Sequence, residues 1–187
     1  MEGAPFQSFE VIEGGGFGGQ PRAAASDPAA AAPAQATKDP LTGLLSRSGL
    51  EPVLEREWNL ASRRAVSSIL LVADIDRFKR INEESGSDMG DRVLKIVSRT
   101  LVESCRATDV VARVGGDDFV VILVGAKGEQ PTSYVERVTK RLARNDRAPT
   151  LSYGWTRLIN ASTPPHAIEL AEALMYKRRA VSRTSAV

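Results

Sequence analysis

Apolar residues form two kinds of pattern along the chain from residue 39 onward. In segments 46–65 and 90–105 they recur at spacings of three and four residues with charged residues between them, which is typical of amphipathic helices. In the second of these segments we expect a buried face made of Val93, Leu94, Val97, Leu101 and Val102. Segment 67–74 (SSILLVAD) is a continuous apolar run between polar residues, which predicts a strand covered on both faces.

Further strands and helices complete the pattern. Residues 109–114 and 119–124 are extended segments joined by Gly115-Gly116-Asp117-Asp118, a composition typical of a hairpin. The other segments are a short helix at 78–84 closed by Gly86, a helix at 130–145, an extended segment at 149–159 and a helix at 165–181. This order predicts an α+β fold of the ferredoxin-like split βαβ type, with a mainly antiparallel central sheet covered by helices.

Composition divides the chain into two parts. Residues 1–37 are rich in Ala, Gly and Pro and have few residues able to form a core, so we expect a disordered N-terminal tail. Residues 38–187 carry most of the Val, Leu and Ile, and we expect them to form one domain.

Charge and cysteine content exclude several classes of protein. The 25 basic and 23 acidic residues nearly cancel, and aromatic residues make up only 5%, which argues against a dedicated nucleic-acid binder. The single cysteine, Cys105, excludes an internal disulfide and a Cys-rich zinc site. No apolar run approaches the roughly 18 residues of a membrane span, and no signal peptide is visible, so we expect a cytoplasmic protein without direct membrane insertion.

Acidic residues concentrate at two strand ends. Asp74-Ile75-Asp76 closes the first apolar strand, and Asp117-Asp118 lies in the predicted hairpin turn. If these strands are neighbours, several carboxylates share one edge of the sheet, where like charges raise each other's pKa or require a counter-ion. Hard divalent cations, which also bind phosphate oxygens, are the usual counter-ions of such a cluster. The alternative is ordinary hairpin and strand-end chemistry without a function.

An ordered set of motifs in residues 39–183 resembles the GGDEF diguanylate cyclases, enzymes that condense two GTP molecules into cyclic di-GMP. The motifs are Asp39-Pro40-Leu41-Thr42-Gly43-Leu44, DIDRFKRIN at 74–82, GSDMGD at 86–91, RATD at 106–109, RVGGDDF at 113–119, Ser152-Tyr153-Gly154 and AEALMY at 171–176. The resemblance implies the nucleotidyl-cyclase-like version of the predicted fold.

The resemblance also implies a role for individual residues. Metal ligands would be Asp74, the carbonyl of Ile75, Asp117 and Asp118, together holding two Mg²⁺ or Mn²⁺ ions, and Asp117 would also help to activate the 3′-hydroxyl. Lys79, the backbone around Phe78, Arg179 and Arg183 would meet the phosphates. Asn82 and Asp91 would bind guanine by hydrogen bonds, and Leu94 would form a wall of the base pocket.

The same resemblance implies that the domain binds GTP, a second copy of itself and cyclic di-GMP. One domain would hold one GTP, so turnover would require a homodimer in which two domains face each other. Arg106 and Asp109 resemble the family's RxxD inhibitory site, which binds the product cyclic di-GMP. The alternative for Arg106 is an arginine that satisfies the last carbonyls of a helix.

The sequence departs from the family pattern at two informative positions. Asp118 replaces the usual glutamate of the signature, which keeps the charge but shortens its reach, and Ser87 replaces a usual histidine. These departures leave a second hypothesis open, a catalytically weak or inactive module that binds GTP or cyclic di-GMP and regulates a partner. A third, relaxed specificity for other dinucleotides, is disfavoured by Asp91 as a guanine ligand.

Overall fold

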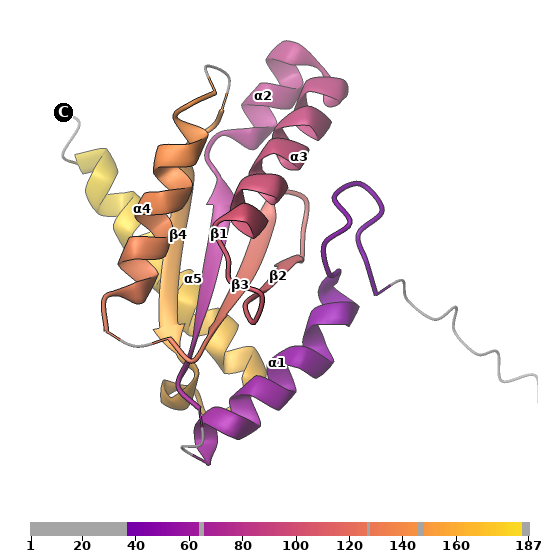
Figure 1. The fold of residues 1–187 in the computed structure, drawn as a ribbon. Helices are drawn as coiled ribbons and strands as arrows, with labels where there is room; N and C mark the ends of the chain where they lie inside the picture. The colour runs from indigo at the N-terminus through magenta and orange to yellow at the C-terminus, as the bar shows by residue number, and fades with distance from the viewer. Residues whose placement is uncertain (1–36, 64–65, 127, 146–147, 185–187) are drawn as a thin grey trace, which may run out of the picture. The chain divides into compact units, whose positions relative to one another are not determined.

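The computed structural model describes residues 37–63, 66–126, 128–145 and 148–184, with side chains up to residue 180 (Figure 1). The predicted tail at 1–37 therefore lies almost entirely outside the described residues. The elements, in chain order, are α1 (Arg47–Ser62), β1 (Ser68–Ile75), α2 (Phe78–Ser85), α3 (Ser87–Glu103), β2 (Val110–Arg113), β3 (Asp118–Val124), α4 (Gln130–Leu142), β4 (Leu151–Arg157), the 3₁₀ helix η1 (Leu158–Asn160) and α5 (Pro164–Thr184).

The described strands form one four-stranded sheet in the order β2-β3-β1-β4, and every neighbouring pair is antiparallel. The two most apolar strands, β1 and β3, lie in the centre, because their side chains are covered on both faces. This order confirms the predicted α+β fold with a ferredoxin-like arrangement, in which the hairpin β2-β3 is inserted beside β1.

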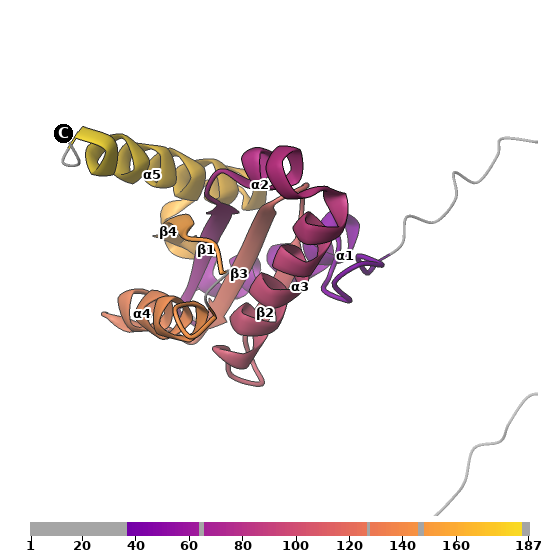
Figure 2. The same cartoon turned by 90° about the horizontal axis from the view of Figure 1, so that it is seen from above.

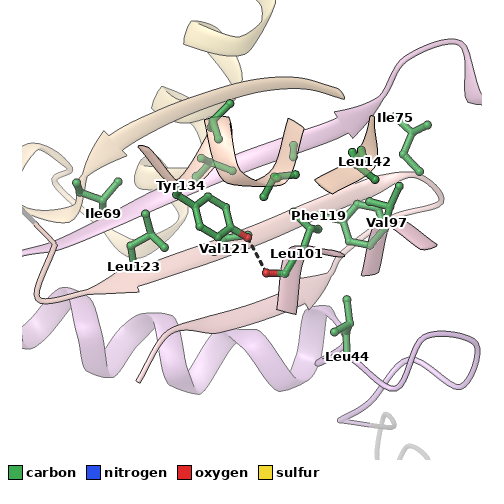
Figure 3. Packing of buried hydrophobic residues seen from close by; sticks show 14 of the residues in the cluster. Leu44, Ile69, Ile75, Val97, Leu101, Phe119, Val121, Leu123, Tyr134 and Leu142 are labelled. Atoms are coloured by element: carbon green, nitrogen blue, oxygen red, sulfur yellow. Dashed lines mark hydrogen bonds between the residues drawn. The ribbon is translucent and has the colours of Figure 1, made fainter. Parts of the chain in front are cut away.

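Helices cover both faces of the sheet, as the view from above shows (Figure 2). Alternate residues of β1 point to opposite faces, so Leu71 and Ala73 belong to a core cluster with α3 and α4, while Leu70 and Val72 belong to a second cluster with α1 and α5. Within the first cluster, the Tyr134 hydroxyl donates a hydrogen bond to the Leu101 carbonyl oxygen at 3.1 Å (Figure 3). The buried polar group of this tyrosine is therefore satisfied.

Two sequence predictions about helices need correction. Helix α3 begins at Ser87, directly after Gly86, instead of at Gly90. Val102 is 47% exposed instead of buried, because it lies on the side of α3 opposite the buried stripe, which continues through Thr100, Leu101 and Ser104. No helix in the described part of the chain is long and apolar enough to cross a membrane.

Helix α5 approaches the sheet very closely at Gly154 in strand β4. A Cβ atom at this position would collide with the Ala171 carbonyl oxygen and with the Met175 backbone nitrogen, and neither backbone atom can move without shifting the helix. The absence of a side chain at Gly154 therefore sets the distance between α5 and the sheet.

We expect Gly154→Ala to lower the free energy of unfolding by about 1–3 kcal/mol, the usual cost of overpacking a tightly packed interface. Urea denaturation measures this change. Gly116→Ala is the matched control, since a Cβ there has nothing within 4 Å and should leave the midpoint nearly unchanged. Equal midpoints for the two variants would contradict the close approach of α5 to β4.

Candidate functional site

The acidic residues predicted from the sequence meet at one edge of the sheet. In the pairing of β1 with β3, Asp74 lies directly opposite Asp118, and in the pairing of β1 with β4 it lies opposite Ser152. Asp117 precedes Asp118 in the turn between β2 and β3. The expectation that these strands are neighbours is confirmed, and the charges of Asp74 and Asp118 both act on Asp117.

Burial and mutual repulsion perturb the two carboxylates of the turn. The pKa of Asp117 is raised, first by burial and then by the negative charges of Asp74 and Asp118. The pKa of Asp118 is raised by burial, by Asp74 and by Glu172 of helix α5. The sequence predicts that like-charge repulsion raises these pKa values, but in the structure burial is the larger cause of the rise.

Arg179 of helix α5 supplies positive charge to this edge. Its Nη2 atom donates hydrogen bonds to Asp74 Oδ1 at 2.7 Å and to Asp76 Oδ1 at 2.9 Å. Burial opposes the charged form of Arg179, but these bonds and the two negative charges outweigh it and raise the pKa of the guanidinium. The side chain predicted to meet phosphate is therefore placed at the acidic edge.

The donor set at this edge suits a hard divalent cation, because three carboxylates and the carbonyl of Ile75 are oxygen ligands. Among the described residues, however, no three His, Cys, Asp or Glu side chains are gathered into a metal site. Asp74 instead interacts with the guanidinium of Arg179. The residues fit the predicted ions, and their assignment as ligands stays a prediction.

The signature turn is held by residues to which sequence reasoning assigned no role. Arg113 donates to the Gly116 carbonyl oxygen from Nε at 3.1 Å and from Nη2 at 2.7 Å, and it pairs with Asp39 at 3.0 Å. A Cβ atom on Gly115 would lie 2.7 Å from Asp118 Oδ2. Asp39 and Arg113 both lie inside the family motifs, which could have marked them as important. Their contact could not be predicted, because the two residues are far apart in the chain.

The start of helix α2 is the segment that the sequence predicts to meet phosphate, and this role stays a prediction. Arg77, which precedes it, adopts a left-handed conformation with φ of 59°, the only positive φ among the described non-glycine residues. No side chain caps the helix, so the first backbone N–H groups, including that of Phe78, are available to an anion. Lys79 is not directed to the acidic edge by any described contact; its amine is 3.7 Å from Glu83.

The two predicted guanine ligands lie on helices α2 and α3, which pack against each other. Asn82 is half-buried on α2, and a Cβ on Gly90 would collide with its Oδ1 atom, so Gly90 makes room for the amide against α3. Asp91 is exposed in α3. Leu94 is only 3% exposed and belongs to the core beneath the helix, and its role as a wall of the base pocket stays a prediction.

The RxxD pair lines a separate hollow of about 220 Å³. Asp109 accepts hydrogen bonds from the Arg106 and Val124 backbone N–H groups, at 2.8 and 3.1 Å. At the end of α3, Arg137 donates to the Ser104 carbonyl oxygen at 3.2 Å, and the product-binding and helix-end roles of Arg106 both stay predictions. Arg137 also lines the hollow and was missed from the sequence because it lies in helix α4, outside the motifs. The side chain of Arg183 lies outside the described residues.

Comparisons with known proteins agree on one family. The model of the family described as "Diguanylate cyclase, GGDEF domain" matches residues 36–185. Diguanylate cyclase DosC of Escherichia coli is 32% identical over 155 residues, covering 78% of this chain and 34% of DosC. Diguanylate cyclase DgcP of Pseudomonas aeruginosa is 41% identical over 109 residues, covering 58% of this chain and 16% of DgcP. The chain thus spans about a third or less of these two relatives.

Solved structures show the same fold. The GGDEF domain of DgcB from Caulobacter crescentus, in complex with c-di-GMP, has a TM-score of 0.72 and 25% identity, covering 77% of this chain and 90% of that one. Diguanylate cyclase SiaD from Pseudomonas aeruginosa, in complex with its activator SiaC, has a TM-score of 0.70 and 29% identity, covering 78% of this chain and 59% of that one.

The electrostatics of the acidic edge predict a stabilising substitution. A carboxyl whose folded-state pKa is raised above its unfolded value costs the folded state free energy while it is ionised, and this cost disappears as the pH falls and both states become protonated. We therefore expect Asp118→Asn to raise the free energy of unfolding at pH 7, on the order of 0.5 kcal/mol, and to have a smaller effect near pH 4.

Urea denaturation at the two pH values, in buffer with a chelator, measures this difference. Glu55→Gln is the matched control, because Glu55 is exposed in the middle of α1, outside the acidic edge. A stabilisation of equal size at pH 7 and pH 4 would contradict an electrostatic origin.

Proposed function

The chain belongs to the GGDEF family, and from this membership we propose that it is a diguanylate cyclase, which condenses two GTP molecules into cyclic di-GMP and pyrophosphate. The observation that carries the proposal is the acidic edge, where Asp74 and Asp118 face each other across β1 and β3 beside Asp117, with Arg179 against Asp74. Such an edge can bind both divalent cations and phosphate.

The division of roles follows from the chemistry of each group. Asp74, the Ile75 carbonyl, Asp117 and Asp118 would hold two Mg²⁺ or Mn²⁺ ions, and such ions would supply positive charge against the α-phosphate and the 3′-oxygen. The raised pKa of Asp117 also suits a group that accepts the proton of the 3′-hydroxyl. The 3′-oxygen of one GTP forms a bond to the α-phosphorus of the other, and the bond from that phosphorus to pyrophosphate breaks.

Binding of GTP uses residues on both sides of the acidic edge. Asn82 and Asp91 orient the guanine, and the uncapped start of α2 and Lys79 bind the phosphates together with Arg179 and Arg183. Since one domain binds one GTP, two copies of the chain face each other in a homodimer to complete the reaction. Each copy then supplies one nucleotide and half of the groups that hold the reacting phosphate.

A second candidate is a module that binds GTP or cyclic di-GMP without turnover. Two observations favour it: the shorter Asp118 in place of glutamate, and the ion pair that occupies Asp74. Product formation separates the two candidates directly, because both predict nucleotide binding and only the enzyme makes cyclic di-GMP.

Removal of the signature acid tests the enzymatic proposal. We expect the wild-type dimer to make cyclic di-GMP from GTP with Mg²⁺ or Mn²⁺, and Asp117→Ala to lower the rate at least about 100-fold, because it removes a metal ligand and a proton acceptor together. Mass spectrometry detects the product. Glu55→Ala, which alters an exposed acid on α1, is the matched control and should keep the wild-type rate. A dimeric wild type without product in either metal would favour the binding module.

Product inhibition tests the hollow at Arg106. A guanidinium that hydrogen-bonds an anionic product contributes about 1.5–3 kcal/mol, so Arg106→Ala should raise the inhibition constant for cyclic di-GMP roughly 10- to 100-fold while leaving the uninhibited rate unchanged. Arg99→Ala is the control, since Arg99 lies on α3, the helix that precedes Arg106, but lines a different hollow. Unchanged inhibition in the Arg106 variant would exclude this hollow as the product site.

A further inference from the structure

Asp76 accepts hydrogen bonds from Ser152, Thr150 and Arg179, and no predicted role accounts for it. Its Oδ1 atom accepts a hydrogen bond from the Ser152 hydroxyl at 2.6 Å, and its Oδ2 atom accepts one from the Thr150 hydroxyl at 2.7 Å. Its backbone N–H donates to the Thr150 carbonyl oxygen at 3.0 Å. These bonds fix the carboxylate of Asp76 against the start of strand β4.

The same carboxylate holds Arg179. One guanidinium nitrogen, Nη2, is shared between Asp76 Oδ1 at 2.9 Å and Asp74 Oδ1 at 2.7 Å. Arg179 therefore lies between two carboxylates. Asp76 is held in place by the hydroxyl groups of Ser152 and Thr150, and Asp74 is a predicted metal ligand.

The two carboxylates differ in what else they face. Asp74 lies opposite Asp118 in the sheet and is open to a cation shared with the signature turn. Both oxygens of Asp76 already accept hydrogen bonds from hydroxyl groups, and the second contact of Oδ1 is the guanidinium itself. A divalent cation bound at Asp74 would compete with Arg179 for that carboxylate, whereas both oxygens of Asp76 already have hydroxyl partners.

We propose that Asp76, supported by Ser152 and Thr150, is a positioning residue that tethers Arg179 at the acidic edge. Arg179 is the counter-ion of Asp74 until a divalent cation takes that carboxylate, and the tether then keeps the guanidinium within reach of a GTP phosphate. The proposal rests on the proposed function for the identity of the nucleotide. In this proposal Asp76 acts by holding Arg179 in place and does not itself contact metal or substrate.

The proposal predicts opposite effects of Arg179→Gln on two ligands. Mn²⁺ alone should bind several-fold tighter, because the competing positive charge next to Asp74 is gone. A GTP analogue with a methylene group between the α- and β-phosphates, at saturating Mn²⁺, should bind about 10-fold weaker, because a charged phosphate contact is lost. Lys177→Gln removes one positive charge from an exposed position on the same helix and should change neither affinity.

A double-mutant cycle tests whether Asp76 acts through Arg179. Asp76→Asn should weaken binding of the same analogue about as much as Arg179→Gln, and the double variant should lose no more than Arg179→Gln alone, within about twofold. Ser152→Ala, which removes one support of Asp76 without changing charge, should show a smaller loss in the same direction. Circular dichroism and calorimetric titration on the full chain provide the folding control and the affinities.

Each result decides the proposal without reference to turnover. Additive losses of affinity in the cycle would mean that Asp76 acts independently of Arg179. An unchanged or lower Mn²⁺ affinity in Arg179→Gln would mean that Arg179 is not a competing counter-ion. Either result overturns the proposal. A wild type that binds neither ligand overturns it as well. A wild type that binds both ligands but makes no cyclic di-GMP refutes the enzymatic function and leaves the tether to be decided by the cycle.

Discussion

The antiparallel pairing of β1 with β3 is the constraint on which the rest of this structure depends. Both strands are almost completely buried, so their register is set by apolar side chains that must meet the correct helix on each face. A shift of one residue would exchange the two faces of a strand. The register that buries Leu70 and Val72 against α1 and α5 is the one that brings Asp74 opposite Asp118.

Packing of the hydrophobic core therefore brings like charges together, and this lowers the stability of the folded state. Burial and repulsion raise the pKa of Asp117 and Asp118, which means that their ionised forms destabilise the folded state. Arg179 offsets part of this cost through Asp74 and Asp76. It can do so because Gly154 lets helix α5 lie close to β4, which connects a packing requirement of the fold to the charge balance of the site.

Local sequence patterns predicted the helices and strands well where one physical requirement, such as burial of an apolar strand or a tight turn, dominated. The apolar run at 67–74 became β1, and the glycine-rich string before Phe119 became the turn of a hairpin. Prediction was wrong in α3, where the helix begins at Ser87 and Val102 lies on the side opposite the buried stripe. It also missed the contacts of Arg113, Arg137 and Asp76, because these join residues dozens of positions apart and a side chain's partner is not encoded in local spacing.

The sequence by itself determined the class of fold, the family and the residue types available for chemistry, because apolar periodicity and ordered motifs are properties of the chain read in order. Only the tertiary structure decided how those residues are paired. It placed the guanidinium of Arg179 between Asp74 and Asp76, joined Arg113 to Asp39, and left Lys79 with Glu83. These pairings arise when strands and helices distant in sequence are brought within a few ångströms, where charge and hydrogen bonding select the partner.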